Sequence, residues 1–145
     1  MAELESASFE IWHAGHSLFV RYTCALDDGD IDTVVSCFTQ NATLESPIIG
    51  SYTGLDEVRR FAQRMAALKT EKGIQLRHMV TNLIVRSDGE TAHATCYLLP
   101  CMTRDGHSEL LPPSQYDCTL LRSSGRWLFE HRVVRADHEY VIADI

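Results

Sequence analysis

The sequence predicts an α+β fold, in which three N-terminal helices pack on one face of a curved antiparallel sheet with a pocket between them. In the first half of the chain, apolar residues recur every three or four positions, which indicates helices. After Gly73 the chain is rich in β-branched residues broken by turn signals, which indicates successive antiparallel strands. Because a strongly twisted sheet cannot fill its own concave side, we expect a pocket between sheet and helices.

The expected helices are bounded by residues that start or stop helices. The first begins at Phe9 and should end at Gly29, since glycine readily adopts the left-handed conformation of a helix cap. Asp30 can cap a second helix that runs through Phe38. A third helix should follow Gly54, because its apolar residues again fall on one side.

The expected strands are separated by glycine-containing turns. They cover residues 41–52, as two short strands around a turn, and then 74–85, 91–101, 116–121 and 127–134. Turn residues such as Ser87-Asp88-Gly89 are typical of hairpins. We therefore expect one domain over residues 1–145, with a core at about 10–137 and a C-terminal tail at 138–145.

Composition and charge narrow the possible partners. The chain has 13 Lys and Arg against 20 Asp and Glu, which gives a formal net charge of −7. This charge argues against nucleic acid or an anionic membrane as a partner, because both require a basic surface. No apolar run approaches the roughly 20 residues that cross a bilayer, and the N-terminus lacks the basic cluster of a secretory signal. We expect a cytoplasmic protein.

The cysteines and histidines predict neither a disulfide framework nor a metal site. The 5 cysteines are odd in number and scattered. His13 and His16 lie one helical turn apart, but no third ligand has a matching spacing. In a strand, His93 and Cys96 would point to opposite faces. There is also no Gly-rich phosphate loop, so we expect no cofactor and no metal.

Several sequence blocks, in this order, resemble the SnoaL-like group of the nuclear transport factor 2-like superfamily. They are RYTCALDDGDIDTVVSCFTQNATLES, GSYTG before a helix, RHMVTN, DGETAHATCYL and QYDCTLLRSSGRWLFEHRVVR. The resemblance covers about residues 10–137 and implies the cone-shaped fold with its pocket. This superfamily contains polyketide cyclases, dehydratases, isomerases, a dehydrochlorinase and non-catalytic binders, so fold alone does not identify a reaction. The resemblance also implies a homodimer or homotrimer.

The most similar functional pattern is that of scytalone dehydratase, the bile-acid dehydratase and the hexachlorocyclohexane dehydrochlorinase. The resemblance implies that Asp27, at the end of the first helix, and His78, on the third strand, are catalytic. It adds Tyr22, five residues before Asp27, as in the bile-acid enzyme. An arginine late in the last strand completes the pattern, with Arg132 as the first candidate and Arg135 as the second.

These residue types suit the removal of a proton from carbon beside a carbonyl group. An imidazole, with an ordinary pKa of about 6.5, can act as the base in a largely dry pocket. The carboxylate of Asp27 would fix the tautomer of His78 and stabilise its cation. Tyr22 and Arg132 could polarise the carbonyl oxygen, and Tyr22 could protonate a leaving hydroxyl. From the residues alone, His78 could equally be a core histidine without a catalytic role.

Strand alternation suggests which other side chains face the pocket. His78 should share a face with Val80, Asn82 and Ile84. On the following strand His93, Tyr97 and Cys101 share one parity, and Tyr97 could point at the substrate. The expected substrate-binding residues are aromatic, apolar or amide side chains: Trp12, Phe19, Phe61, Met65, Asn82 and Tyr97.

Together these features predict a cofactor-independent lyase or isomerase acting on a hydrophobic polycyclic or polyketide- or steroid-like carbonyl compound, with dehydration ranked first. An aldol-type cyclase, for which Asp117 is the only acid on the fifth strand, an isomerase, and a non-catalytic binding or assembly module are alternatives. Epoxide hydrolysis is less favoured, because no pair of acids stands at pocket-facing positions. Tyr140, Val141 and Ile142 in the tail are apolar enough to close a pocket or to contact another subunit.

Overall fold

Three helices occupy the positions that the capping residues predict. The structure, a computed structural model, describes residues 3–142. The helices are α1 (Phe9–Asp28), α2 (Ile31–Ser36) and α3 (Leu55–Thr70). α1 ends at Gly29, whose φ is 74°, and the carboxylate of Asp30 caps α2 by accepting the backbone N–H of Thr33 at 3.2 Å. The predicted end of α1 and start of α2 are confirmed. α2 stops at Ser36 rather than at Phe38, because Phe38 already belongs to a strand.

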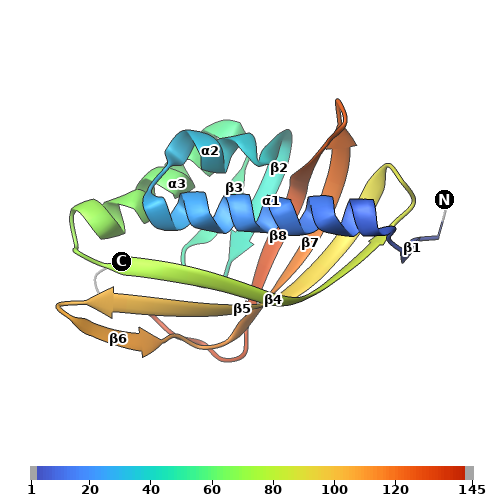
Figure 1. Cartoon of the computed structure of the whole chain (residues 1–145). Helices are drawn as coiled ribbons and strands as arrows, with labels where there is room; N and C mark the ends of the chain where they lie inside the picture. Colours follow the sequence, from blue (N-terminus) through green and yellow to red (C-terminus); the bar gives the residue numbers. More distant parts are fainter. Residues whose placement is uncertain (1–2, 143–145) are drawn as a thin grey trace.

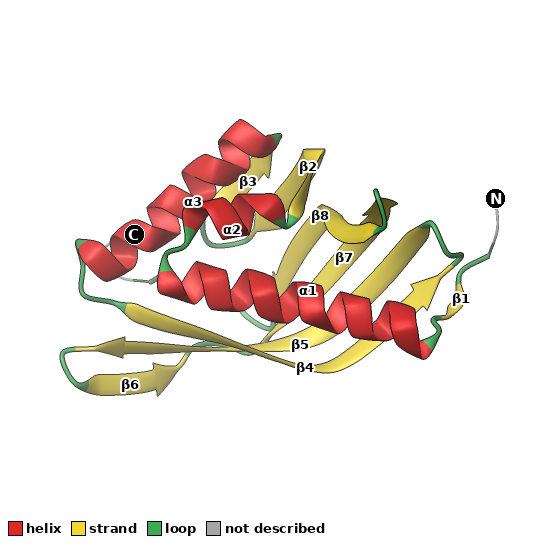
Figure 2. Ribbon diagram, turned by 45° about the horizontal axis from the view of Figure 1, so that its top comes forward, coloured by secondary structure: helices red, strands yellow, loops and turns green. Residues whose placement is uncertain are grey.

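A single sheet forms the rest of the molecule (Figures 1 and 2). Its strands are β1 (Glu5–Ser6), β2 (Phe38–Ser46), β3 (Gly50–Thr53), β4 (Gln75–Ser87), β5 (Thr91–Arg104), β6 (His107–Leu110), β7 (Ser114–Ser123) and β8 (Arg126–Ala136). The spatial order is β1-β4-β5-β7-β8-β2-β3, and β6 pairs with the end of β5. The analysis of the sequence did not predict β1 and β6, because both are very short and every residue in them is exposed.

The helices cover one face of the curved sheet, and α1 runs across its concave side (Figures 1 and 2). This is the predicted α+β cone. The sheet is mixed rather than wholly antiparallel, because β2 and β8 pair in parallel. These two strands lie far apart in the chain, so no tight hairpin turn forces them to be antiparallel. Within residues 3–142, none of the helices is both long and apolar enough to cross a membrane.

A β-bulge divides β4 into two halves with opposite alternation. Thr81 pairs with Tyr97 and Ile84 pairs with Thr95, so Asn82 and Leu83 together oppose a single residue of β5. Asn82 has a φ of 57°, in the left-handed region. The expectation that Asn82 and Ile84 share the inner face with His78 is therefore wrong: Ile84 is 61% exposed, and Asn82 is exposed at the bulge.

Candidate active site

The end of α1 carries two of the expected site residues. Tyr22 is fully buried, and Asp27 lies in the last turn, just before the helix cap. The backbone carbonyl of Asp27 accepts a hydrogen bond from the side-chain amide of Gln75 at 3.1 Å. Because Gln75 begins β4, this bond ties the end of the helix to the start of the strand that carries His78.

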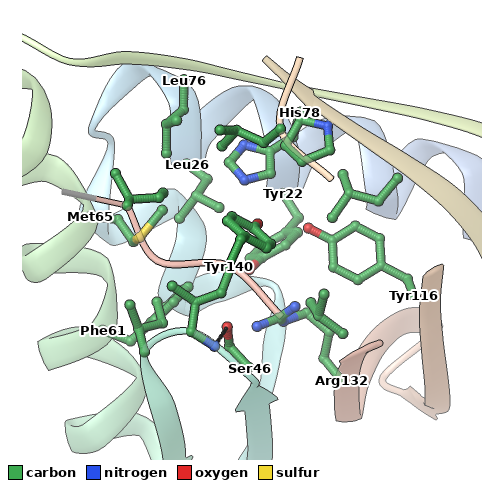
Figure 3. Close-up of a pocket in the computed structure, with 17 residues that line it drawn as sticks. Tyr22, Leu26, Ser46, Phe61, Met65, Leu76, His78, Tyr116, Arg132 and Tyr140 are labelled. Atoms are coloured by element: carbon green, nitrogen blue, oxygen red, sulfur yellow. Dashed lines mark hydrogen bonds between the residues drawn. The ribbon is translucent and has the colours of Figure 1, made fainter. Parts of the chain in front are cut away.

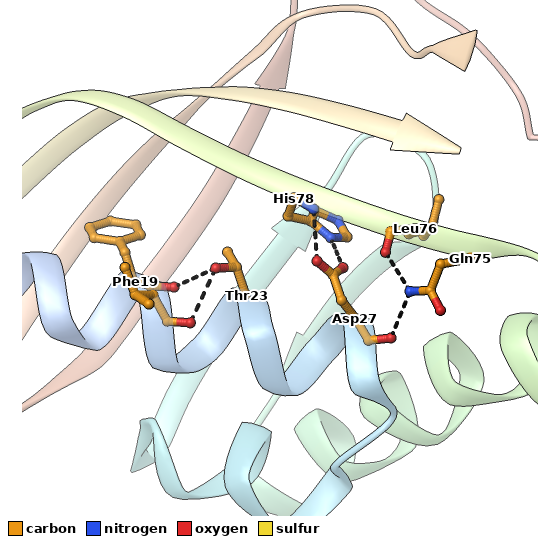
Figure 4. A network of polar contacts seen from close by, with 7 residues as sticks. Phe19, Thr23, Asp27, Gln75, Leu76 and His78 are labelled. Carbon is orange, nitrogen blue, oxygen red and sulfur yellow. Dashed lines mark hydrogen bonds and ion pairs between the residues drawn. The ribbon is translucent and has the colours of Figure 1, made fainter. Parts of the chain in front are cut away.

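Asp27 holds His78 through two hydrogen bonds (Figure 4). Nδ1 of His78 lies 2.5 Å from Oδ1 of Asp27, and the backbone N–H of His78 donates to Oδ2 at 2.8 Å. The two side chains are only 9% and 8% exposed. Because a carboxylate accepts but does not donate, Nδ1 is the donor. Nε2 makes no hydrogen bond with any residue of the described chain, so it remains available as an acceptor.

His78 lies in the wall of a mostly apolar cavity between the helices and the sheet (Figure 3). The space open to a water-sized sphere is about 60 Å³, which is room for a few water molecules. Its walls come from α1, α3, the sheet and the segment after β8. They are formed by Tyr22, Leu26, Ser46, Ile48, Ile49, Phe61, Met65, Leu76, His78, Leu98, Pro100, Leu111, Tyr116, Arg132, Val134, Tyr140 and Ile142.

Arg132 enters this cavity from β8 and is surrounded by aromatic rings (Figure 3). It is 2% exposed. The central carbon of its guanidinium lies 5.6 Å from the ring centre of Tyr22, 5.7 Å from that of Phe61 and 5.2 Å from that of Tyr116. These distances are within the range of cation–π attraction. Nε of Arg132 is buried without a hydrogen-bond partner.

Two tyrosines contribute hydroxyl groups to the same region. Burial raises the pKa of Tyr22 to about 12, although the positive charge of Arg132 opposes this shift. Burial also raises the pKa of Tyr116 well above its ordinary value. Both phenols therefore keep their protons near neutral pH and can act as hydrogen-bond donors. The hydroxyl of Tyr22 is buried without a partner.

The other expected substrate-binding residues divide into three groups. Phe61 and Met65 line the cavity beside His78 and Arg132. Trp12, Phe19 and Asn82 instead border a second hollow, which lies next to the bulge of β4. Tyr97 points to the outside of the sheet and is 53% exposed, because the inward positions of β5 are the even-numbered ones. The structure therefore brings some of these residues to the cavity and places the others elsewhere.

Tyr116 and two residues of the tail also line the cavity. Tyr116, which was not expected there, is an inward residue of β7, and the alternation of polar and apolar residues over 115–120 could have indicated its face. In the tail, Val141 is 87% exposed and does not close the pocket. Tyr140 and Ile142 lie in the expected tail, and both border the cavity. Ile142 packs in a small cluster with Leu68 and other buried residues, so this part of the tail covers one side of the site. Residues 143–145 of the expected tail lie outside the described residues.

A second histidine–aspartate pair lies on the outer face of the sheet. Nε2 of His93 is 2.6 Å from Oδ1 of Asp117, and the side chains are 44% and 33% exposed. Arg135 approaches the other oxygen of Asp117 at 3.4 Å. Asp117, the acid considered for a cyclase, therefore points away from the cavity. Across residues 3–142, no three His, Cys, Asp or Glu side chains cluster in a way that could hold a metal ion.

The fold and cavity together define an α+β cone with a sheltered histidine–aspartate pair. The family model described as a SnoaL-like domain matches residues 14–133. The chain therefore belongs to the SnoaL-like family. None of the curated proteins matches it.

Solved structures share the fold at low sequence identity. A protein from Catenulispora acidiphila, in complex with S-DNPA, has a TM-score of 0.78 and 23% identity over 90% of this chain and 96% of that chain. A provisionally named scytalone dehydratase from Novosphingobium aromaticivorans DSM 12444 has a TM-score of 0.74 and 17% identity over 87% and 83%. An NTF2-like protein with a cystatin-like fold, also from Novosphingobium aromaticivorans, has a TM-score of 0.72 and 19% identity over 91% and 81%. These identities establish a common fold.

Proposed function

We propose that this protein is a cofactor-independent lyase or isomerase that acts on a hydrophobic carbonyl compound, with dehydration as the first-ranked reaction. The observation that carries the proposal is the 2.5 Å contact between His78 Nδ1 and Asp27, in the wall of an apolar cavity. The hydrogen bond to Asp27 orients the imidazole ring and leaves Nε2 of His78 free to act as the base. The SnoaL-like family and the neighbour named as a scytalone dehydratase support the same class of reaction.

In a dehydration, Nε2 of His78 takes the proton from the carbon next to the carbonyl group, and the electrons of the C–H bond form an enolate. Protonated Tyr22 and the cation of Arg132 stabilise the negative oxygen. The enolate then expels the β-hydroxyl group, which receives the proton from His78 and leaves as water. The products are an unsaturated carbonyl compound and water, and His78 returns to its neutral form.

The same first step could serve double-bond isomerisation, in which the proton returns to another carbon. The geometry supports an aldol-type cyclase less well, because Asp117 lies on the outer face of the sheet. A polycyclic substrate is larger than a space of about 60 Å³, so its entry requires side chains such as Tyr140 to move. The neighbour solved with S-DNPA supports small-molecule binding by this fold.

The proposal can be tested without knowing the natural substrate. A model reaction is the base-promoted ring opening of 5-nitrobenzisoxazole, in which proton removal from carbon breaks an N–O bond and yields a coloured phenolate. We expect His78→Ala to lower the rate by about 100-fold or more, with an unchanged circular dichroism spectrum. His93→Ala removes the outer histidine and should leave the rate within about twofold. Equal rates in the two variants would rule out His78 as the base.

A further inference from the structure

Arg132 is a buried charge for which the described chain provides no counter-ion. It is 2% exposed, and its Nε is buried without a hydrogen-bond partner among residues 3–142. Its contacts are with the rings of Tyr22, Phe61 and Tyr116. A guanidinium has five N–H donors, and ring faces replace few of the hydrogen bonds that it makes in water.

The other residues around the cavity do not supply the missing negative charge. Among residues 3–142, no aspartate or glutamate lines it. The nearby carboxylate of Asp27 is already bound by the ring and the backbone of His78. The remaining polar wall consists of hydroxyl groups and His78. Arg132 thus gives the cavity a positive charge among apolar walls, and a buried unpaired charge is retained only at a cost in stability.

We infer that the compound bound in this cavity carries an anionic oxygen, as a carboxylate or phenolate, attached to an apolar body. The anion would lie against Arg132, where charge-assisted hydrogen bonds replace the missing partners. Tyr116 lines the same cavity with its hydroxyl pointing into it (Figure 3), and this protonated phenol can donate to a bound ligand. The apolar body would contact side chains such as Phe61 and Met65. This inference rests on the proposed function in that both use one cavity, but it concerns binding and not proton transfer.

Three ligands of the same shape and different charge test the inference. They are benzoate, benzamide and benzamidine, measured by isothermal titration calorimetry against the wild-type chain. We expect benzoate to bind at least about tenfold more tightly than benzamide, because one charge-assisted contact differs by about that factor. Benzamidine should bind most weakly. If benzamide binds as well as benzoate, or if benzoate does not bind, the inference is wrong for a carboxylate.

Matched arginine variants show whether Arg132 is the source of the preference. Arg132→Gln should remove it, and Arg132→Lys should retain part of it. Arg135→Gln removes the same charge from the same strand, but from an exposed side chain, and should leave the preference unchanged. A preference that survives in a folded Arg132→Gln protein, or that is lost in Arg135→Gln, would overturn the assignment to Arg132.

A second probe distinguishes a carboxylate from a phenolate. Bound 4-nitrophenol reports its own ionisation by its absorbance, and we expect it to bind as the phenolate in the wild type and as the phenol in Arg132→Gln. Binding of benzoate or of 4-nitrophenolate supports the inference and shows which kind of anion the cavity accepts. If neither anion binds, the inference is wrong. His78→Ala should keep the preference for benzoate over benzamide even when proton transfer is lost. Failure of the proposed reaction and failure of this inference therefore give different results.

Discussion

The molecule contains two histidine–aspartate pairs with nearly the same separation and very different surroundings. His78 and Asp27 approach to 2.5 Å inside the cone, with side chains that are less than a tenth exposed. His93 and Asp117 approach to 2.6 Å on the outer face, where a third or more of each side chain is exposed. A short distance therefore does not by itself define a catalytic pair. The inner pair differs because water is largely excluded, which strengthens its electrostatic interactions.

The two arginines of β8 repeat this contrast. Arg135 lies outside, and Asp117 provides its counter-ion at 3.4 Å. Arg132 lies inside against aromatic rings. On the outer face, Asp117 thus has both His93 and Arg135 as partners. In the part of the chain that the structure describes, Nε of Arg132 and Nε2 of His78 have no hydrogen-bond partner, so both can bind a ligand.

The first prediction compares the reaction rates of variants of the two aspartates, for which the largest difference in this comparison is expected. Asp27→Asn should lower the rate of 5-nitrobenzisoxazole opening by about tenfold or more, because an amide no longer fixes the tautomer of His78 or stabilises its cation. Asp117→Asn makes the same chemical change on the outer face and should leave the rate within about twofold. A similar loss in both variants would mean that the two pairs do not differ in function.

The second prediction concerns stability and compares the arginines. Arg132→Met replaces an unpaired buried charge by an apolar side chain and should raise the free energy of unfolding of the ligand-free protein by about 1 kcal/mol. This corresponds to an increase in Tm of about 3 °C. Arg135→Met should change stability by less than about 0.5 kcal/mol. Thermal unfolding of both variants checks this. A lower Tm for Arg132→Met would mean that the three rings stabilise the cation by more than its burial costs.

The smallest expected effect is a pH dependence of the outer pair. The hydrogen bond from His93, with a further contribution from Arg135, holds the pKa of Asp117 below its usual value of 3.8. A carboxyl group whose pKa is lower in the folded than in the unfolded state stabilises the folded protein at pH values above its ordinary pKa. This stabilisation is lost as the pH falls through the pKa of the folded state. Asp117→Asn should therefore weaken the loss of stability below about pH 4. Urea unfolding over a pH series measures the free energy of unfolding at each pH. His93→Gln should weaken the loss of stability at low pH in the same way. Identical profiles for the wild type and both variants would contradict this prediction.

The parts of the fold that could be predicted from the sequence depend on local chemistry. Gly29 ends α1 and Asp30 begins α2 through their own backbone geometry and hydrogen bonds, so no distant residue is needed. The alternation of β4 likewise places Leu76, His78 and Val80 on one face, as expected. The α+β architecture could be predicted because most of the strands follow the helices in the chain, whereas the cone was implied by the family resemblance.

The remaining features depend on which strands pair and in which register. The bulge at Asn82 is defined by the opposite strand, so the outward position of Ile84 could not be obtained from alternation. Tyr97 and Tyr116 both lie in predicted strands, and alternation indicates their faces: Tyr97 shares its parity with polar residues and Tyr116 with apolar ones. Which side chains Tyr116 meets in the cavity depends on long-range pairing. The cavity position of Arg132 was implied only by the family resemblance, because an arginine in a strand is ordinarily expected to face solvent.

The bulge of β4 has a consequence for the comparison of relatives. Without Asn82, Val80 and Leu83 would stand two positions apart, and the strand would alternate without interruption from Leu76 to Val85. Such a strand would bend less. A homologue that lacks the extra residue must therefore be aligned with a one-position gap at this point. If the gap were placed before His78 instead, the imidazole would be matched to an outward position, and the proposed base would be assigned to the wrong side of the sheet.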